Sequence, residues 1–317
     1  MPEIFDDKSE HCIPFLLERL RAHQARHGNS PEAPPFFLGL NGVQGAGKTV
    51  LVSTLYQTLR SPPYSLPVIT LSLDDIYLTH DDQVSLAAAN PSNPLLQHRG
   101  QPSTHDLALG ERVFSSLRAG HLTAIPQYDK SAFSGQGDRV PESQWEVVNA
   151  AGQSKIRVVI FEGWCVGFRP LDETTLHTKW QAAVTEKERN PEYSGRLGHV
   201  KYEDVKAVND SLKRYDILTD QLDALIHIDA QDSHFVYDWR QEQERTLRAA
   251  KGTGMTEEQV NQFVDGYYPS YELFTGNLRA GVFKTSSTGP ASLPGRSGRQ
   301  LRLVVNKQRR VEQVIKI

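Results

Sequence analysis

Short apolar runs alternate with longer amphipathic stretches along most of the chain. The apolar runs, each long enough for a buried strand, span residues 36–40, 68–73, 156–161 and 224–228. Both alternating faces of these runs are apolar, which is typical of parallel strands covered by helices on each side. Helical spacing of apolar residues is found at 50–59, 107–117 and 203–222. The alternation predicts an α/β fold with a parallel sheet flanked by helices.

The two ends of the chain depart from this pattern. Ile13, Leu16 and Leu20 repeat at helical spacing, so we expect residues 1–35 to form an N-terminal helix and linker before one domain over 36–317. Near the other end, 286–300 is rich in Gly, Ser and Pro and predicts a flexible loop between strands at 281–284 and 301–305. The polar stretch 172–201 predicts a surface insertion to which we assign no function.

Composition narrows the classes of partner. The 317 residues carry 35 Lys and Arg against 38 Asp and Glu, a net charge of −3, which disfavours nucleic acid as a main partner. No apolar run is long enough to span a membrane, and the acidic N-terminus is unlike a targeting peptide. Two distant cysteines fit a reducing compartment, so we expect a cytoplasmic protein. The sequence leaves its oligomeric state open.

One motif carries the strongest chemical signal. The residues at 42–49 match the Walker A pattern G-x-x-x-x-G-K-[ST] between an apolar strand and a helical segment. In order, they are Gly42, Val43, Gln44, Gly45, Ala46, Gly47, Lys48 and Thr49. The pattern predicts backbone N–H groups around the phosphates of ATP, with Lys48 at the β- and γ-phosphates and Thr49 on Mg²⁺. An accidental glycine-rich turn is the alternative.

The residues after the other strands favour a small-molecule kinase among proteins with this loop. The only Asn-Lys pair lacks the carboxylate of a guanine-binding N-K-x-D motif, and Glu162 ends its strand alone, unlike the Asp-Glu of many motor ATPases. Asp74 and Asp75 follow a strand at the edge where parallel sheets build their sites. We expect Asp74 to be a base or a metal-water ligand, and Asp75 to cap the following helix.

Two polar segments predict a site for an anionic acceptor. Arg99 and His105 lie in the first, and Lys130 and Arg139 in the second. Together they suit a carboxylate or a transferred phosphate. The alternatives are that Asp106 caps a helix and that Arg139 is a surface residue.

A basic helical stretch at about 233–255 predicts a lid. Arg240 would bring a guanidinium to the γ-phosphate as the lid closes and excludes water. The alternative is a solvated face with Arg240 and Arg245 paired to Glu242 and Glu244, which we prefer for Arg245 only.

Several strings, in order, resemble the plant-type D-glycerate 3-kinases and their fungal relatives, in the P-loop group of pantothenate and uridine kinases. The resemblance covers about residues 36–274. Besides the Walker A loop, its motifs are S-L-D-D-I-Y-L-T at 72–79, the segments 95–106 and 128–139, E-G-W at 162–164, W-R at 239–240 and G-M-T at 254–256.

The resemblance implies a P-loop nucleoside triphosphate hydrolase fold with a helical lid and a phosphotransferase that uses ATP and Mg²⁺. It places Asp74 as the base, Glu162 near the metal with Thr49 and Asp74, and Arg240 with Lys48 in catalysis. It also places His105, Asp106, Tyr128 and Lys130 where related kinases hold the acceptor. With Asp74, Tyr77, Arg99 and Arg139, these residues make up the acceptor-binding set that we expect. Ile76, Ser103 and Cys165 depart from its pattern and leave the acceptor open. D-glycerate is the first expectation; the alternatives are another small alcohol, or an ATP-binding regulatory or assembly protein that transfers nothing.

Overall fold

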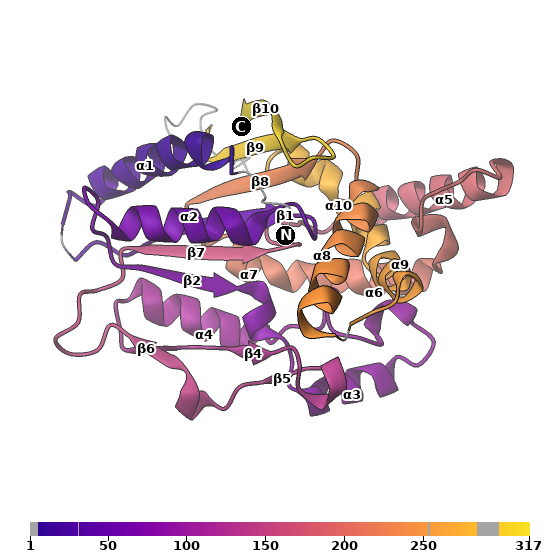
Figure 1. Cartoon of the computed structure of the whole chain (residues 1–317), viewed down its shortest axis with the longest axis horizontal. Coiled ribbons are helices and arrows are strands. Elements are labelled where there is room, and N and C mark those ends of the chain that lie inside the picture. Colours follow the sequence, from indigo (N-terminus) through magenta and orange to yellow (C-terminus); the bar gives the residue numbers. More distant parts are fainter. Residues whose placement is uncertain (1–5, 31, 253, 284–297) are drawn as a thin grey trace.

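A six-stranded mixed sheet organises the computed structural model, which describes residues 6–30, 32–252, 254–283 and 298–317 (Figure 1). Its strand order is β10-β9-β8-β1-β7-β2. The strands are β1 (Phe36–Gly42), β2 (Val68–Ser72), β7 (Val158–Gly163), β8 (Ala224–Ala230), β9 (Gln300–Val305) and β10 (Val311–Lys316). Only β10 pairs antiparallel within this sheet. The predicted parallel α/β sheet is therefore confirmed, with one edge strand that the sequence pattern did not predict.

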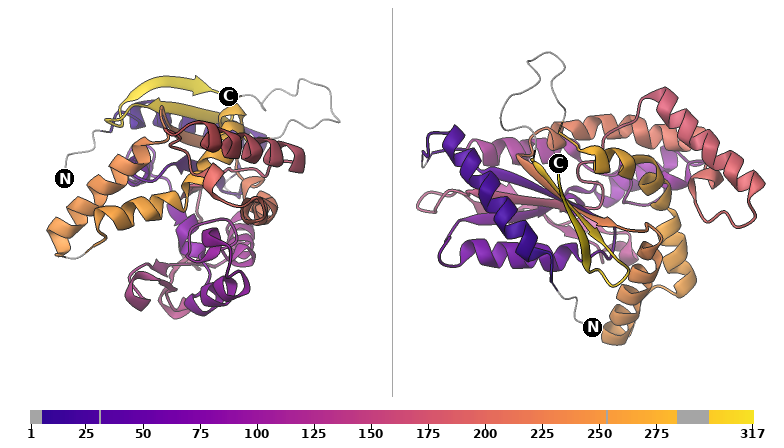
Figure 2. Two further views of the ribbon diagram at one scale, coloured as in Figure 1. Left: turned by 90° about the vertical axis from the view of Figure 1, so that its right-hand side faces the viewer. Right: turned by 90° about the horizontal axis from the view of Figure 1, so that it is seen from above.

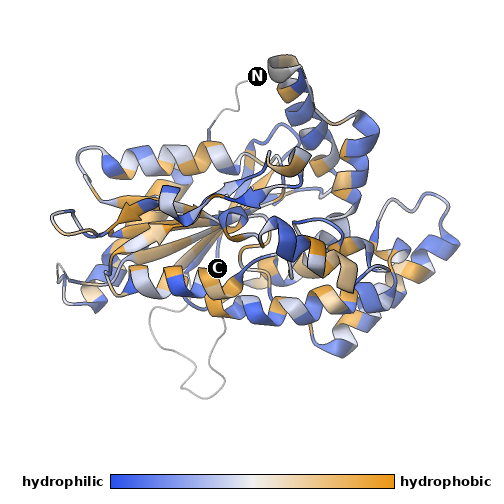
Figure 3. Cartoon of the chain, turned by 90° about the horizontal axis from the view of Figure 1, so that it is seen from below, coloured by the Kyte–Doolittle hydropathy of each residue, from blue (hydrophilic) through white to orange (hydrophobic). Residues whose placement is uncertain are grey.

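Side chains alternate between the two faces of the sheet because successive residues of a strand point in opposite directions. In β1, the Phe36 ring lies 5.6 Å from the ring of His23, and the Phe37 ring lies 4.9 Å from that of Phe114. His23 belongs to α1 (Ser9–Arg26) and Phe114 to α4 (Leu107–Arg118). Helices thus cover both faces, and Figure 3 shows the apolar strands between helices with polar outer faces.

The remaining helices complete the layers and the region beyond the strands. Long helices of the described residues, besides α1 and α4, are α2 (Lys48–Arg60), α3 (His80–Ala89), α5 (Glu173–Arg189), α6 (Tyr202–Leu212), α8 (Phe235–Lys251), α9 (Glu257–Asp265) and α10 (Tyr268–Ala280). Shorter elements are α7 (Asp216–Thr219), β3 (Thr123–Ile125), β4 (Tyr128–Asp129), β5 (Asp138–Arg139) and β6 (Glu146–Val148). The arrows of β2 and β7 point toward α8 (Figure 1). None of the helices described is both long and apolar enough to cross a membrane.

The two ends of the chain lie side by side on the sheet. Lys316 of β10 forms an ion pair of 2.7 Å with Glu18 of α1, and α1 runs beside the β9–β10 hairpin (Figure 2). The buried residues Cys12, Leu16 and Leu20 of α1 belong to the main hydrophobic core. The N-terminal helix therefore packs as part of the same body as the sheet.

Three boundaries differ from the sequence predictions. The strand expected at 281–284 is absent from its described part, because the Val282 N–H bonds to the Gln300 side chain rather than to a neighbouring strand. The helix expected over 203–222 is broken after Leu212. The flexible loop expected at 286–300 lies outside the described residues as far as position 297, and Gln300 already belongs to β9.

Candidate active site

The glycine-rich loop lies between the end of β1 and the start of α2. Gly45 and Gly47 have φ angles of 81° and 96°, a left-handed conformation that glycine adopts without steric cost. The Lys48 ammonium donates 2.7 Å to the Gly42 carbonyl. Burial lowers the pKa of Lys48, and the nearby carboxylates of Glu162 and Asp74 oppose that shift. The loop therefore brings a cation and two carboxylates together at the carboxyl edge of the sheet.

Strand pairing explains how the carboxylates reach the loop. β7 lies between β1 and β2, and Glu162 is in register with Ser72. The Ser72 hydroxyl donates 2.7 Å to Glu162 Oε1. Ser72 also accepts from the N–H of Asp74, while Asp75 accepts from the Ser72 N–H at 3.0 Å. Ser72 is thus the N-cap of the short 3₁₀ turn Leu73–Ile76 and Asp75 is its partner in a capping box, whereas α3 is capped by Thr79 rather than by the aspartate that the sequence suggested. Asp74 takes no part in the capping box through its side chain.

Asp74 forms an ion pair with Lys130. Their atoms lie 2.5 Å apart, with exposed side-chain fractions of 25% and 58%. Burial alone would raise the pKa of Asp74, but the Lys130 ammonium holds it below its usual value. Asp74 is therefore ionised at neutral pH and can accept a proton.

His105 and Tyr77 form the wall behind Asp74. Their rings stack with centroids 4.5 Å apart, and His105 Nδ1 lies 2.6 Å from the Tyr215 hydroxyl. Burial lowers the pKa of His105 to about 3, so the imidazole stays neutral. His105 Nε2 and the Tyr128 hydroxyl are buried without hydrogen-bond partners, and such groups are costly unless a ligand or water satisfies them.

Both arginines that the sequence predicts for the acceptor site, Arg99 and Arg139, donate hydrogen bonds to backbone carbonyls. Arg99 donates to the carbonyls of Gly135 and Gln136 and so holds the 130–137 loop. Arg139 donates 2.8 Å to the Tyr77 carbonyl and pairs with Asp106 at 3.2 Å. Asp106 also caps α4, as the alternative from the sequence had it. These residues shape the acceptor side, while Lys130 remains the exposed cation beside Asp74.

Arg240 lies on α8 and is turned away from solvent. Its side chain is 20% exposed and pairs with Glu244 at 3.5 Å, and its guanidinium lies 5.0 Å from the centre of the Phe263 ring of α9. Arg245 is exposed, as expected. Trp239, next to Arg240, packs on Gly45, where an added Cβ would lie 2.5 Å from the Trp239 Cβ. The predicted lid helix therefore contacts the glycine-rich loop.

Sequence reasoning missed an aromatic wall on α10. Tyr267 and Tyr271 pack edge-on against Trp164, with ring centroids 5.0 and 5.5 Å apart, and the Tyr267 hydroxyl donates 3.2 Å to the Arg99 carbonyl. A cluster of tyrosines at helical spacing, Tyr267, Tyr268 and Tyr271, is the signal that could have found it.

The donor set fits a magnesium ion that is held mainly by nucleotide phosphates. Thr49, Asp74 and Glu162 offer oxygen atoms, which Mg²⁺ prefers, and Mg²⁺ is commonly held by one or two carboxylates together with phosphates. Over the residues described, no group of three or more His, Cys, Asp or Glu could hold a metal ion on its own. An all-protein metal cage is therefore not part of this region.

Comparison with known proteins links the site to a group of kinases. No family model matches the chain. An uncharacterized kinase of Schizosaccharomyces pombe is 40% identical over 250 residues, 78% of this chain and 84% of that protein. The chloroplastic D-glycerate 3-kinase of Arabidopsis thaliana is 32% identical, over 84% of this chain and 54% of its own. The solved structure of a D-glycerate 3-kinase from Cryptococcus neoformans superposes with a TM-score of 0.84 at 34% identity, over 99% of this chain and 100% of that one.

Proposed function

This chain belongs to the family of the D-glycerate 3-kinases and related fungal kinases, and we propose that it transfers the γ-phosphoryl group of MgATP to a hydroxyl of D-glycerate. That it is a phosphotransferase with an alcohol acceptor follows from the family. The acceptor and the residue roles are our proposal.

The observation that carries the proposal is the Asp74–Lys130 pair beside the glycine-rich loop. A hydroxy acid has one group for each partner: its hydroxyl can bond to the Asp74 carboxylate, and its carboxylate to the Lys130 ammonium. The pair is already formed beside the glycine-rich loop, and the exposed Lys130 side chain can move from Asp74 to the acceptor. An uncharged alcohol would leave the lysine without this exchange of partners.

Five side chains then act on the transfer. Asp74 takes the proton of the acceptor hydroxyl, whose oxygen forms a bond to the γ-phosphorus as the bond to the β-γ bridging oxygen of ATP breaks and ADP leaves. Lys48 and Arg240 stabilise the charge on the transferring group. Mg²⁺, held by Thr49 and Glu162 with Asp74, would neutralise phosphate charge.

His105, Tyr77 and Tyr128 line the acceptor side in this proposal. The unpartnered His105 Nε2 and Tyr128 hydroxyl supply hydrogen-bonding groups for the remaining acceptor oxygens. Because His105 stays neutral, its contribution to acceptor binding does not change between pH 6 and 9.

The test is ADP release by the purified protein with MgATP and each of D-glycerate, pantothenate, uridine or no acceptor. Lys48→Ala is the blank, because it removes the cation at the phosphates while the glycines stay. We expect turnover with D-glycerate alone, lost in the blank. Turnover with pantothenate or uridine instead would replace the acceptor. ATP binding with a flat panel would favour a regulatory or assembly protein.

A further inference from the structure

The turn between β9 and β10 reaches the glycine-rich loop from the far end of the chain. Arg309 Nε donates 2.7 Å to the Gly45 carbonyl, and Arg309 Nη2 donates 2.6 Å to Glu242 of α8. The guanidinium also lies 5.3 Å from the centre of the Trp239 ring. One side chain, 8% exposed, therefore joins the loop to the lid helix.

Gly45 is the position where such a contact matters. A loop that turns its N–H groups inward to phosphates directs its carbonyls outward, and a buried carbonyl needs a donor. Gly45 is buried and has a positive φ, so it lies outside the regular hydrogen bonding of β1 and α2. The fork of Arg309 supplies the donor, and it does so from a rigid hairpin.

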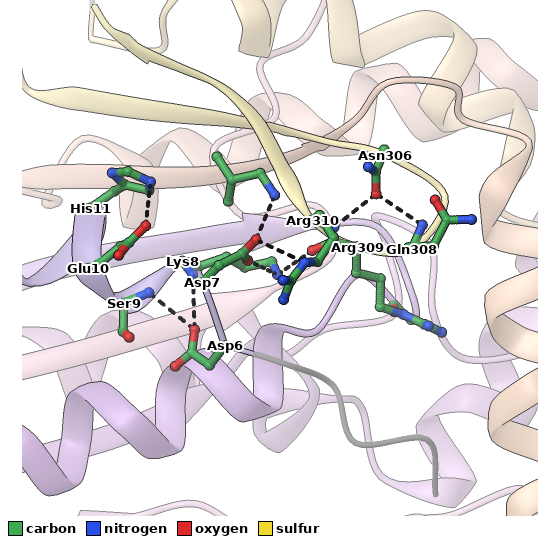
Figure 4. Close-up of polar contacts among 12 residues, drawn as sticks. Asp6, Asp7, Lys8, Ser9, Glu10, His11, Asn306, Gln308, Arg309 and Arg310 are labelled. Carbon is green, nitrogen blue, oxygen red and sulfur yellow. Dashed lines mark hydrogen bonds and ion pairs between the residues drawn. The ribbon is translucent and has the colours of Figure 1, made fainter.

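Arg309 occupies the left-handed position of the turn between β9 and β10, which its N–H closes by donating 2.8 Å to the Asn306 carbonyl. Its φ is 62°, which is uncommon for a residue other than glycine. The Lys8 ammonium, whose side chain is 2% exposed, donates 2.6 Å to the Arg309 carbonyl, and the next N–H but one, that of Val311, donates 3.0 Å to Asp7. Figure 4 shows Asp7 and Lys8 against this turn.

We infer that Arg309 is a positioning residue of the nucleotide site, which orients the Gly45 peptide so that the loop is ready for phosphates before ATP arrives. The inference rests on the proposed binding of ATP by this loop. Since the contact is the same in the ground state and the transition state, its loss weakens nucleotide binding and leaves the chemical step nearly unchanged.

The experiment compares Arg309→Lys with Arg169→Lys by isothermal titration with MgATP and MgADP, by kinetics, and by the unfolding midpoint. Lysine keeps the charge but loses the planar fork. Arg169 is the matched control: it is also 8% exposed and also joins segments, through Asp216, Asp220 and the Val282 carbonyl. Both variants therefore lose comparable buried hydrogen bonds, but only one of them contacts the loop.

We expect Arg309→Lys to raise the Kd and the KM for ATP about tenfold, as for one lost charge-assisted hydrogen bond, with kcat within about twofold of the unaltered protein. Arg169→Lys should lower the unfolding midpoint and leave the Kd unchanged. A lowered midpoint with unchanged Kd in Arg309→Lys would overturn the inference and reduce Arg309 to a structural strut. A failure of the unaltered protein to bind MgATP would instead overturn the proposed function, and this inference with it.

Discussion

Two aspartates at the carboxyl edge of the same sheet are built into opposite kinds of environment. Asp229 in β8 receives paired hydrogen bonds from Arg279 and is bonded by Arg302 at 2.7 Å, and its side chain is 3% exposed. Asp74, after β2, is paired with one exposed lysine. Each has a buried neutral histidine nearby, His227 and His105.

The difference separates a carboxylate used for structure from one available for chemistry. Both guanidinium groups on Asp229 come from elements packed against β8, so its oxygens are occupied and fixed. The ion-pair partner of Asp74 is an exposed lysine on a loop that Arg99 holds by its backbone. Among the residues that the structure describes, Asp74 therefore has no guanidinium partner, and the lysine paired with it is largely open to solvent. The same residue type at equivalent strand ends thus gives a structural ion network in one place and a candidate base in the other.

Replacing Asp74 and Asp229 by asparagine, one at a time, should give the largest contrast between an effect on turnover and an effect on stability. Asp74→Asn should lower kcat about 10³-fold with the Kd for MgATP within twofold, because it removes the proton acceptor and keeps the shape. Asp229→Asn should lower the free energy of unfolding by about 3 kcal/mol, since two guanidinium groups lose their partner. Steady-state kinetics and urea unfolding on both variants measure this. Unchanged turnover in Asp74→Asn would remove Asp74 from the mechanism.

Removing one cationic partner of each aspartate, Lys130 or Arg302, should separate acceptor binding from stability in the same way, with smaller effects. Lys130→Met should raise the KM for D-glycerate roughly 10–100-fold, the effect of a charge-assisted hydrogen bond, and leave stability within about 1 kcal/mol because the pair is exposed. Arg302→Met should cost about 2 kcal/mol of unfolding free energy and leave that KM unchanged. If Lys130→Met destabilised the protein and left the KM as it was, the lysine would be structural and the acceptor model wrong.

The sequence predicted the two regions unequally, for a physical reason. The loop at 42–49, and Asp74 and Glu162 after apolar runs, are local patterns, and parallel pairing brings strand ends to one edge. The capping-box contact of Asp75 with the Ser72 N–H also depends on local spacing. The network of Asp229 was not predicted, because its partners come from α10 and β9, far apart in the chain. Arg309 has the same origin: it contacts Gly45 across 264 positions.

Long-range packing also gives two of the predicted acceptor-site residues partners that the sequence did not indicate. Arg99 and Arg139 were expected to bind the acceptor directly, but each guanidinium donates to backbone carbonyls. Residue type indicates which groups an arginine can bind, and the fold decides whether backbone carbonyls take them first. The edge strand β10 escaped because its burial is slight, with Val314 45% exposed, so no apolar run marks it.

The pH dependence of stability should distinguish the candidate site from the Asp229 network by its sign. Burial raises the pKa of Asp75 from its usual value of 3.8 to about 6. The folded protein thus binds the proton more tightly, and this contribution to stability is complete below about pH 4 and lost as the pH rises to about 6. Asp229 has a lowered pKa, so its contribution is present above about pH 4 and lost as the pH falls.

Asp75→Asn should therefore flatten the decline in stability between pH 4 and pH 6.5 by about 1–2 kcal/mol, since the side chain is partly exposed. The check is urea unfolding at several pH values, with Asp229→Asn in parallel, which should lower stability above about pH 4 and flatten the fall in stability below that pH. If the unfolding free energies of the unaltered protein and of Asp75→Asn changed in parallel with pH, the Asp75 carboxyl would have the same pKa in the folded and the unfolded protein.

The smallest expected effect concerns Ser72, which bonds to Glu162 where the Asp229 network uses arginines. Its hydroxyl donates 2.7 Å to Glu162 and accepts from the Asp74 N–H at 3.2 Å. Ser72→Ala should raise the Mg²⁺ concentration for half-maximal rate about 3–5-fold, because the loss of one hydrogen bond to the Glu162 carboxylate costs about 1 kcal/mol. It should also lower stability by about 1 kcal/mol through the lost cap. Ser72→Thr keeps the hydroxyl and should restore the Mg²⁺ requirement. Thr79→Ala removes the cap of α3 and should cost similar stability with no change in that requirement. An unchanged Mg²⁺ requirement in Ser72→Ala would mean either that Glu162 holds its place without Ser72 or that Glu162 does not support the metal. Glu162→Gln separates these two cases, because the Mg²⁺ requirement of that variant stays unchanged only if Glu162 does not support the metal.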